Sequence, residues 1–404
     1  MLSYENARHK VIEVVASRRA EPARETLAIY QALGRVLGEE IRADRDYPPF
    51  HRSTRDGFAV RAADLAKLPA TLELIGEIKA GDTFGGEVGA GQCVRIMTGA
   101  GLPAGADSVV MIEHTKPAKT RVTFERLVER GQNVVPGGSE AKAGQVLLSP
   151  GVRLGYAELA LAAQVGHHRV EVNARPRVAI LSTGDEVVPV EKKPGPSQIR
   201  NSNSVSLAAQ AALAGGEPVP LGNAPDSEPE LRALIEQGLE ADLLVLSGGV
   251  SIGKYDLVET VLRRLGAEFF FDAVAIRPGR PAVFSWCRGK PVFGLPGNPV
   301  STMVTFELFV VPAIDLLSGT EPRPLALFRA RLAAPLRQKA ALTHFLPAQV
   351  TWREGEPLVQ ELPWQGSGDI VALAQANCFL VVPETRLEWG AGDWVDVLPR
   401  RDRL

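Results

Sequence analysis

The sequence predicts a multi-domain protein of α/β and β structure, built around an open, mostly parallel α/β sheet. Between residues 177 and 320, apolar runs typical of buried strands alternate with helical patterns. Residues 44–142 and 325–404 instead show short alternating runs separated by glycine- and proline-bearing turns, which predict β domains. The chain has 404 residues, which is too many for a single core.

The N-terminal region predicts a helix over residues 3–18, capped by Ser3. Helical patterns follow at Ile29–Leu37 and at residues 154–166. We expect the last pattern to rejoin the N-terminal helices in space. Residues 1–43 and 143–176 would then form a discontinuous helical domain, into which the β segment of residues 44–142 is inserted.

The central segment, residues 177–324, predicts the α/β domain. VAILS (178–182) and LLVLS (243–247) are β-branched apolar runs typical of strands buried on both faces. Ser227 and Glu230 have the spacing of a capping box. The remaining predicted strands are 217–221 and 292–295, and the predicted helices are 204–214, 227–237, 257–265 and 300–317. A proline-rich hinge then leads to the C-terminal β domain, residues 325–404.

Composition argues against several classes of protein. The net charge is −2, without the basic stripe or stacking aromatics of a nucleic-acid-binding protein. No run reaches 18 apolar residues and the N-terminus has no signal-peptide core, so we expect a cytoplasmic protein without a membrane partner. The three cysteines lie far apart, which favours buried structural thiols in a reducing compartment.

Three predicted strands of the α/β domain end in glycine-rich loops: LSTGDE (181–186), LSGGVSIGKYD (246–256) and GLPGNPVS (294–301). Ligands bind at this edge of an open α/β sheet, and glycine amides together with a helix N-terminus suit a phosphate. Each loop alone could be an ordinary turn. The candidate binding residues are Gly184, Asp185, Gly248, Gly249, Ser251, Gly253, Pro296, Gly297, Asn298, Pro299 and Ser301.

The second loop nearly matches a nucleotide-triphosphate P-loop. Gly248, Gly253 and Lys254 have the required spacing, but Tyr255 stands where that motif needs a serine or threonine hydroxyl for magnesium. We therefore interpret the loop as part of a different phosphate site.

Carboxylates accompany the glycine-rich loops. Glu186, Asp226 and Asp256, together with phosphate oxygens, suit Mg²⁺, which prefers hard oxygen ligands. Asp256 could instead be a helix cap, Asp226 a turn residue, and Asp185 and Glu186 solvated loop residues.

Two arginines form a further candidate site. Arg277 and Arg280 bracket a Pro-Gly turn, and two guanidinium groups on a rigid turn suit an oxyanion or phosphate. The alternative is that both arginines are solvated surface residues.

Eight motifs together resemble the MoeA family of molybdopterin molybdenumtransferases, whose relatives include the gephyrin and plant Cnx E domains. The resemblance covers essentially the whole chain. The motifs are STRDGFAV (53–60), RIMTGAGLPAGADSVV (95–110), GQNV (131–134), LSTGDEVV (181–188), SGGVSIGKYD (247–256), RPGRP (277–281), GLPGNPVS (294–301) and QGSG (365–368).

The resemblance implies an architecture and a reaction. The α/β domain would have the MogA-like molybdopterin-binding fold, and a β-barrel-like domain would close the chain. The enzyme would insert molybdenum from molybdate into adenylated molybdopterin, with Mg²⁺-dependent hydrolysis and release of AMP. It would be a homodimer whose active site is shared between protomers. Contacts with a MogA-type adenylyltransferase and with molybdoenzyme-maturation proteins are further expectations.

The resemblance also implies roles for particular residues. Asp56 and Thr98 would come from the partner protomer. Glu186, Asp226 and Asp256 would hold the metal and orient the attack. Pterin or phosphate would be received by Gly248, Gly249, Ser251 and Gly253, and the oxyanion site would include Arg277, Arg280 and Ser367.

The chain departs from the family pattern at a few positions. Arginines that usually follow GQNV are replaced by Val135, Pro136 and Gly137, and an arginine associated with oxyanion binding is replaced by Pro347. The alternative function is therefore a non-catalytic molybdopterin-binding paralogue that carries or scaffolds the cofactor. A preference for tungstate over molybdate is a third possibility that the sequence leaves open.

Overall fold

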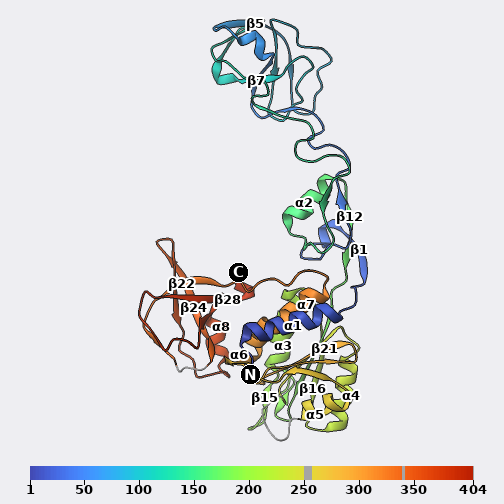
Figure 1. Cartoon of the computed structure of the whole chain (residues 1–404), viewed down its shortest axis with the longest axis vertical. Coiled ribbons are helices and arrows are strands. Elements are labelled where there is room, and N and C mark those ends of the chain that lie inside the picture. Colours follow the sequence, from blue (N-terminus) through green and yellow to red (C-terminus); the bar gives the residue numbers. More distant parts are fainter. Residues whose placement is uncertain (250–256, 339–341, 404) are drawn as a thin grey trace.

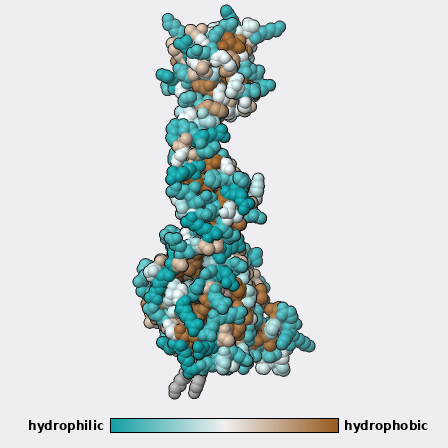
Figure 2. Space-filling view, turned by 90° about the vertical axis from the view of Figure 1, so that its right-hand side faces the viewer, coloured by the Kyte–Doolittle hydropathy of each residue, from teal (hydrophilic) through white to brown (hydrophobic). Residues whose placement is uncertain are grey.

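The computed structural model describes residues 1–249, 257–338 and 342–403. The molecule is elongated, with a β domain at one end, a small connecting unit in the middle, and an α/β domain beside a β-barrel at the other end (Figure 1). A side view shows the same three tiers, with hydrophobic residues scattered over a largely hydrophilic surface (Figure 2). Both chain termini lie in the tier that holds the α/β domain and the barrel (Figure 1).

The distal β domain is a six-stranded sheet of order β7-β4-β6-β5-β9-β8. One face is packed around Phe58 and Phe124, whose rings meet edge to face at 5.9 Å. The other face buries Ile78, Val94 and Ile96. The elements are β4 (Gly57–Val60), η2 (Ala62–Leu65), β5 (Ala70–Ile78), β6 (Gln92–Ile96), β7 (Ser108–Met111), η3 (Ile112–His114), β8 (Thr115–Pro117) and β9 (Arg121–Phe124).

The connecting unit consists of paired short strands and one helix. Two crossings of the chain run side by side through it, and α2 packs in the same small core as the turn η1. Its elements are β1 (Arg24–Ala28), η1 (Ile29–Gln31), β2 (Ile41–Arg42), β3 (Arg52–Ser53), β10 (Val134–Val135), β11 (Val146–Leu148), α2 (Tyr156–Gln164) and β12 (Arg169–Asn173), with pairs β1–β12, β2–β11 and β3–β10.

The predicted helix over Ile29–Leu37 is wrong. Only Ile29–Gln31 forms a single 3₁₀ turn, and Gly34 then adopts a left-handed φ of 74° that a continuing helix does not allow. The following residues pair with distant strands instead, Val36 with Arg153 and Leu37 with Val172. Long-range pairing therefore overrides a local helical pattern here.

The N-terminal helix α1 (Tyr4–Arg18) is confirmed, and the hydroxyl of Ser3 accepts a hydrogen bond from the amide of Asn6 at 3.3 Å. Its predicted association with residues 154–166 is wrong. The apolar face of α1 lies in the core of the α/β domain, against helix 299–317. The middle tier is therefore not a helical domain, because its predicted first helix belongs to another core.

The α/β domain contains a mixed six-stranded sheet of order β16-β13-β17-β21-β20-β18. The first four strands pair in parallel, and β20 pairs antiparallel with both β21 and β18, so only β20 runs in the opposite direction. The two faces of the sheet carry separate cores. The strands are β13 (Arg177–Thr183), β16 (Glu217–Ala224), β17 (Leu243–Ser247), β18 (Glu268–Phe271), β20 (Val283–Cys287) and β21 (Lys290–Leu295). The helices are α3 (Ser202–Ala214), α4 (Glu228–Gly238) and α5 (Leu257–Arg264).

The capping box predicted for α4 is wrong, because the side chain of Ser227 makes no capping hydrogen bond. The predicted end of α3 is confirmed: Gly215 takes the left-handed φ of 102° that ends many helices. The smaller elements of the domain are the ladder of β14 (Val187–Val188) with β15 (Ile199–Arg200), and β19 (Ile276–Arg277).

The long helix predicted over residues 300–317 is present but contains a π turn. It consists of α6 (Pro299–Thr305), the π segment η4 (Phe306–Val310) and α7 (Val311–Leu317). Pro312 has no amide to donate to Leu308, and that carbonyl instead accepts a hydrogen bond from the guanidinium of Arg8 at 2.9 Å. The helix is apolar and long enough for a membrane span, but 83% of it is buried, so it is the central helix of this core.

The C-terminal domain is a closed barrel. Strands β24, β25, β22, β28 and β26 pair in that order, and β26 pairs back to β24. A parallel pairing of β19 with β24 joins the barrel to the α/β domain. The elements are β22 (Phe328–Leu332), β23 (Leu336–Arg337), β24 (Thr343–Arg353), β25 (Glu356–Glu361), α8 (Ile370–Gln375), β26 (Cys378–Val382), β27 (Glu388–Trp389), β28 (Trp394–Pro399) and η5 (Arg401–Arg403).

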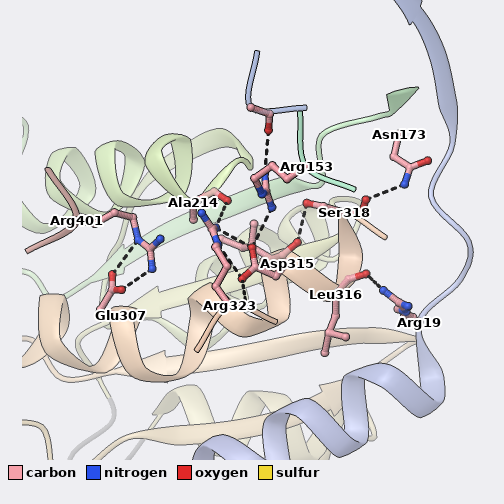
Figure 3. A network of polar contacts seen from close by, with 12 residues as sticks. Arg19, Arg153, Asn173, Ala214, Glu307, Asp315, Leu316, Ser318, Arg323 and Arg401 are labelled. Atoms are coloured by element: carbon pink, nitrogen blue, oxygen red, sulfur yellow. Dashed lines mark hydrogen bonds and ion pairs between the residues drawn. The ribbon is translucent and has the colours of Figure 1, made fainter. Parts of the chain in front are cut away.

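A buried ionic network fixes the connecting unit to the α/β domain (Figure 3). Asp315, at the end of α7, has a fully buried side chain. Its carboxylate pairs with Arg323 at 2.7 Å and with Arg153, which precedes α2, at 3.0 Å. Arg153 also donates to the carbonyl of Gly34 at 2.9 Å. One carboxylate thus connects the middle tier, the core helix and the hinge to the barrel.

We predict that Asp315→Ala lowers the free energy of unfolding by about 3 kcal/mol, because it leaves two partly buried guanidinium groups without their shared anion. Chemical denaturation followed by circular dichroism measures the change. Glu268→Ala removes the anion of the exposed pair between Arg18 and Glu268 and should change stability little. Equal effects of the two variants would contradict the importance of the buried network.

Candidate active site

Three strand ends of the α/β domain meet at one edge without intervening side chains. A Cβ atom on Gly297, after β21, would lie 3.6 Å from the Cα of Gly248, after β17. A Cβ atom on Gly248 would lie 2.9 Å from the carbonyl oxygen of Thr183, at the end of β13. The predicted loops after β17 and β21 therefore lie side by side, with their main chains close together. Ser251, Gly253 and Asp256 lie outside the described residues.

The acidic loops after β13 and β16 lie next to each other. The amide of Asp226 donates to the carboxylate of Asp185 at 3.1 Å. Glu186 folds back over Gly184, where a Cβ atom would lie 2.4 Å from its Oε2 atom. Glu186 and Asp226 are both exposed. The two loops thus present several carboxylate oxygens at the edge where the glycine loops end.

Across the described residues, no three His, Cys, Asp or Glu side chains are close enough to hold a metal ion. Glu186 and Asp226 are the two predicted metal ligands for which the structure gives a position. Asp256, the third, lies outside the described residues, so the full ligand set stays a prediction.

Asn223 is a residue of this site that sequence reasoning missed. Its Nδ2 atom donates to the carbonyls of Gly184 at 2.8 Å and Val187 at 3.3 Å, the two ends of the loop that carries Asp185 and Glu186. Both acceptors are carbonyls, so the orientation of the amide is fixed. The only signal in the sequence was the position of Asn223 at the end of a predicted strand.

Asn203, near the start of α3, was also missed. Its Nδ2 atom donates to the carbonyl of Gly297 at 2.7 Å and to the hydroxyl of Ser247 at 2.8 Å, while its Oδ1 atom is buried without a partner. It thereby ties the helix to the ends of β17 and β21. The polar run NSNS (201–204) directly before a helical pattern was the available signal.

A cleft of about 1070 Å³ lies where the α/β domain meets the barrel. Asn298, before α6, donates to the hydroxyl of Ser367 in a barrel loop at 2.8 Å, and the amide of Val300 donates to the carbonyl of Ser367 at 3.0 Å. The predicted binding residues that line this cleft are Arg277, Arg280, Pro296, Asn298, Ser301 and Ser367.

Two of the three arginines that line the cleft form no ion pair within the described residues, whereas the third, Arg337, pairs with Glu388. Arg277 and Arg280 are exposed, and within the described residues neither forms an ion pair. Gly279 between them has a φ of 111°, and a Cβ atom there would lie 2.7 Å from Thr305, so the turn requires glycine. Two unpaired guanidinium groups on a fixed turn are suited to bind a tetrahedral oxyanion.

Asp56, directly before β4, and Thr98, just after β6, lie together in the distal β domain. This domain is at the opposite end of the molecule from the α/β domain and the barrel, whose residues line the cleft (Figure 1). The amide of Thr98 donates to Asp56 Oδ1 at 2.7 Å, and its hydroxyl donates to the same atom at 2.9 Å. These bonds, first from the amide and second from the hydroxyl, hold the pKa of Asp56 below its ordinary value. Asp56 is therefore an exposed carboxylate that is ionised at neutral pH.

We predict that Thr98→Val raises the pKa of Asp56 part of the way to its ordinary value of about 4, because the amide donor remains. An NMR titration of the carboxyl group measures this. Since the folded-state pKa is lowered, the contact stabilises the fold above that ordinary value and loses its effect as pH falls through the lowered one. Thr71→Val, which breaks the pair between Thr71 and Thr123 in the same domain, should leave the titration of Asp56 unchanged.

We predict that Asn223→Ala loosens the loop of residues 184–187 and costs about 2 kcal/mol, because two carbonyls lose their donor. Amide hydrogen exchange of the loop, with a denaturation midpoint, measures both effects. Asn377→Ala is the matched control, since Asn377 donates to Val350 within the barrel at 2.9 Å. Unchanged exchange of the loop in Asn223→Ala would show that the amide does not hold it.

Comparisons with known proteins cover almost the whole chain. Residues 2–166 match the family model "MoeA N-terminal region (domain I and II)", residues 179–316 match "Probable molybdopterin binding domain", and residues 329–399 match "MoeA C-terminal region (domain IV)". A molybdopterin molybdenumtransferase of Bacillus subtilis is 37% identical over 94% of this chain and 90% of its own length. The protein of the same name from Staphylococcus epidermidis is 32% identical, over 96% and 94%.

Two solved structures are similar over their full length. Both are molybdopterin biosynthesis MoeA proteins of Pyrococcus horikoshii. One superposes with a TM-score of 0.76 at 34% identity, covering 99% of each chain. The other superposes with a TM-score of 0.81 at 27% identity, covering 99% of this chain and 100% of its own.

Proposed function

The chain belongs to the MoeA family and is a transferase of molybdenum cofactor biosynthesis, and from this premise we propose that it inserts molybdenum from molybdate into adenylated molybdopterin. The reaction would hydrolyse the phosphoanhydride and release AMP. The observation that carries the proposal is the cleft in which two unpaired arginines and Ser367 lie beside the loop that leads into α6.

The phosphorylated pterin would bind at the carboxyl edge of the sheet. Exposed backbone at Gly248 and Gly297 can approach a phosphate closely, because neither residue carries a Cβ atom. Asn203 keeps these two strand ends together through Ser247 and the carbonyl of Gly297. The role of this chain at the pterin is therefore to bind and orient it against the cleft.

Molybdate, as the second substrate, would bind between Arg277, Arg280 and Ser367. Guanidinium groups suit a tetrahedral dianion because they offer several donors in a fixed plane. Pro347, which stands where the family carries an arginine, lies in the barrel wall opposite Phe379. The charge of the cleft would accordingly come from the turn of residues 277–281 and from other side chains of the barrel.

Magnesium would be held by Glu186, Asp226 and Asp256. The chemistry of the donors fits, since carboxylate oxygens with phosphate oxygens are the ligands that this cation prefers. When bound, Mg²⁺ would neutralise charge on the phosphoryl oxygens. The chain itself would fix the loop that carries Glu186, because Asn223 donates hydrogen bonds to carbonyls at both ends of this loop.

A homodimer would complete this site. Asp56 and Thr98 lie in a tier remote from the cleft (Figure 1), so a role in the reaction requires the β domain of a second copy. The connecting unit also exposes Tyr30, Leu33 and Tyr156, with exposures of 96%, 61% and 88%, which supports self-association of this tier.

The cellular setting is also part of the proposal. The cysteines Cys93, Cys287 and Cys378 are buried and unpaired, which fits the reducing cytoplasm. The MogA-type adenylyltransferase that would supply the adenylated pterin, and the maturation proteins that would take the product, are its expected partners.

Arg277→Ala and Arg280→Ala should each lower molybdate-stimulated AMP release at least about tenfold, because a charge-assisted contact to the oxyanion is lost. Release is measured with purified protein, adenylated molybdopterin, Mg²⁺ and molybdate. Arg288→Ala, which removes a surface arginine paired with Glu236, is the control. Pterin binding without AMP release by the unmodified protein would favour the carrier or scaffold function instead.

Mixing inactive variants tests the shared site. Asp56→Ala and Arg277→Ala should each be inactive alone, while a mixture allowed to exchange subunits should regain about a quarter of normal activity, since half of the dimers hold one intact site of two. A mixture of Arg277→Ala with Arg280→Ala, whose changes fall in the same domain, should show no such gain. Absence of rescue in the first mixture would argue against a shared site.

A further inference from the structure

His344 lies in the wall of the cleft but has no part in the function proposed above. It is the second residue of β24 and is only 3% exposed. Its side chain lines the same cleft as Arg277, Arg280 and Ser367. Within the described residues, the imidazole forms no hydrogen bond. Neither ring nitrogen is among the polar atoms that are fully buried without a hydrogen-bond partner. The ring therefore keeps free hydrogen-bonding capacity beside the cleft.

The barrel places His344 directly beside Arg277. In the parallel pairing of β19 with β24, these two residues are register partners, so their side chains project to the same face. On its other side His344 pairs with Val382, which is apolar. An anion held by the guanidinium of Arg277 would accordingly lie within reach of the imidazole.

The remaining charged groups near this wall are mostly occupied elsewhere. Arg337, across the cleft, pairs with Glu388 at 3.0 Å. Glu384 accepts a hydrogen bond from Thr343 at 2.6 Å. In the loop opposite, Glu361 accepts from Trp364 and Asp369 accepts from the amide of Gln365.

Two charges near the cleft have no such partner. Among the described residues Arg277 and Arg280 alone line the cleft as unpaired cations, and no carboxylate lines it. Within the described residues, therefore, no carboxylate in the lining of the cleft would hold a proton on the ring of His344 in the free protein.

Burial, and second the charge of Arg277, lower the pKa of His344 below its ordinary value. The ring is therefore neutral at neutral pH in the free protein. A bound dianion would reverse this balance, since it cancels the repulsion by Arg277 and attracts a proton.

We propose that His344 is a further ligand of the oxyanion in this cleft, and that it takes up one proton from solvent onto its ring as the anion binds. The inference rests on the proposed function, because it requires the cleft to receive a tetrahedral dianion. The protonated ring donates a hydrogen bond to an anion oxygen and adds the third positive charge that Pro347 does not supply.

The sign of the pH dependence follows from the two states. The pKa of His344 is lowered in the free protein and raised in the complex. The gain in affinity is complete below the pKa of the free protein and disappears as pH rises through the pKa of the complex. Anion affinity should thus decrease with increasing pH across the neutral range. The steepest decrease is about tenfold per pH unit, which corresponds to uptake of one proton per anion.

Isothermal titration calorimetry of the full-length protein with sodium molybdate, and separately with sodium sulfate, tests the proposal. Each titration is run in two buffers that differ in ionisation enthalpy, which reports the protons taken up per anion. We expect proton uptake with both anions. His344→Gln should abolish it and weaken binding at pH 6 by about tenfold, as expected for loss of a charged hydrogen bond.

His168→Gln is the matched control, because it removes an exposed histidine of the connecting unit. It should preserve both affinity and proton uptake. Thermal denaturation checks that each variant is folded, and His344→Asn gives a second neutral variant if His344→Gln does not fold. Proton uptake that survives loss of His344 in a folded protein would overturn the inference.

The two proposals can fail separately. If the unmodified protein binds neither anion, the oxyanion site of the proposed function is wrong and the role of His344 is wrong with it. If it binds molybdate without proton uptake, the cleft is an oxyanion site and only the role of His344 is wrong. Arg277→Ala, which should weaken the binding of both anions at least about tenfold, tests the oxyanion site while His344 is unchanged.

Discussion

The arrangement of this elongated molecule depends on one buried carboxylate. Asp315 lies in the last turn of the core helix of the α/β domain, and its side chain is fully buried, so its charge must be matched by nearby cations. The cations come from different tiers: Arg153 from the connecting unit and Arg323 from the hinge that leads to the barrel. This network fixes the connecting unit to the α/β domain (Figure 3), and the distal β domain is attached through that unit (Figure 1).

A second joint sets the shape of the cleft. The short parallel pairing of β19 with β24 joins the α/β domain to the barrel. The two domains also share apolar packing, since Phe345, Phe379 and Leu398 of the C-terminal domain lie in the core of the α/β domain. The strand pairing brings Arg277 and His344 side by side, and the hydrogen bonds of Ser367 to Asn298 and Val300 hold the opposite side together. The cleft is thus formed from loops that are fixed by neighbouring strands and helices, which favours a binding surface that is largely preformed.

Two kinds of binding group meet at this junction: main-chain groups at the edge of the sheet and charged side chains in the cleft and the loops. At the carboxyl edge of the sheet, glycines expose main-chain groups, and two asparagines hold the strand ends and loops in position. In the cleft, Arg277 and Arg280 form no ion pair within the described residues, so their guanidinium groups can bind an anion. In the strand order β16-β13-β17-β21, the carboxylates follow the first two strands, and the glycine loops follow the two strands nearer to the cleft. These neighbouring groups suit a reaction in which an oxyanion and a phosphorylated ligand bind side by side.

Much of this protein could be predicted from its sequence, because hydrophobic periodicity and glycine-rich strand ends are local signals. The strands of the α/β domain, the helix at Tyr4–Arg18 and the cluster of loop residues around Gly248 and Gly297 follow from such patterns. The β-barrel-like C-terminal domain, expected from the family resemblance, is also confirmed. The tertiary structure alone decided that Ile29–Leu37 is not a helix and that α1 packs on the α/β core. It also decided that Asn203, Asn223 and His344 lie at the site. Each of these outcomes depends on contacts between residues far apart in the chain, and a local sequence pattern does not show which distant residues will be in contact.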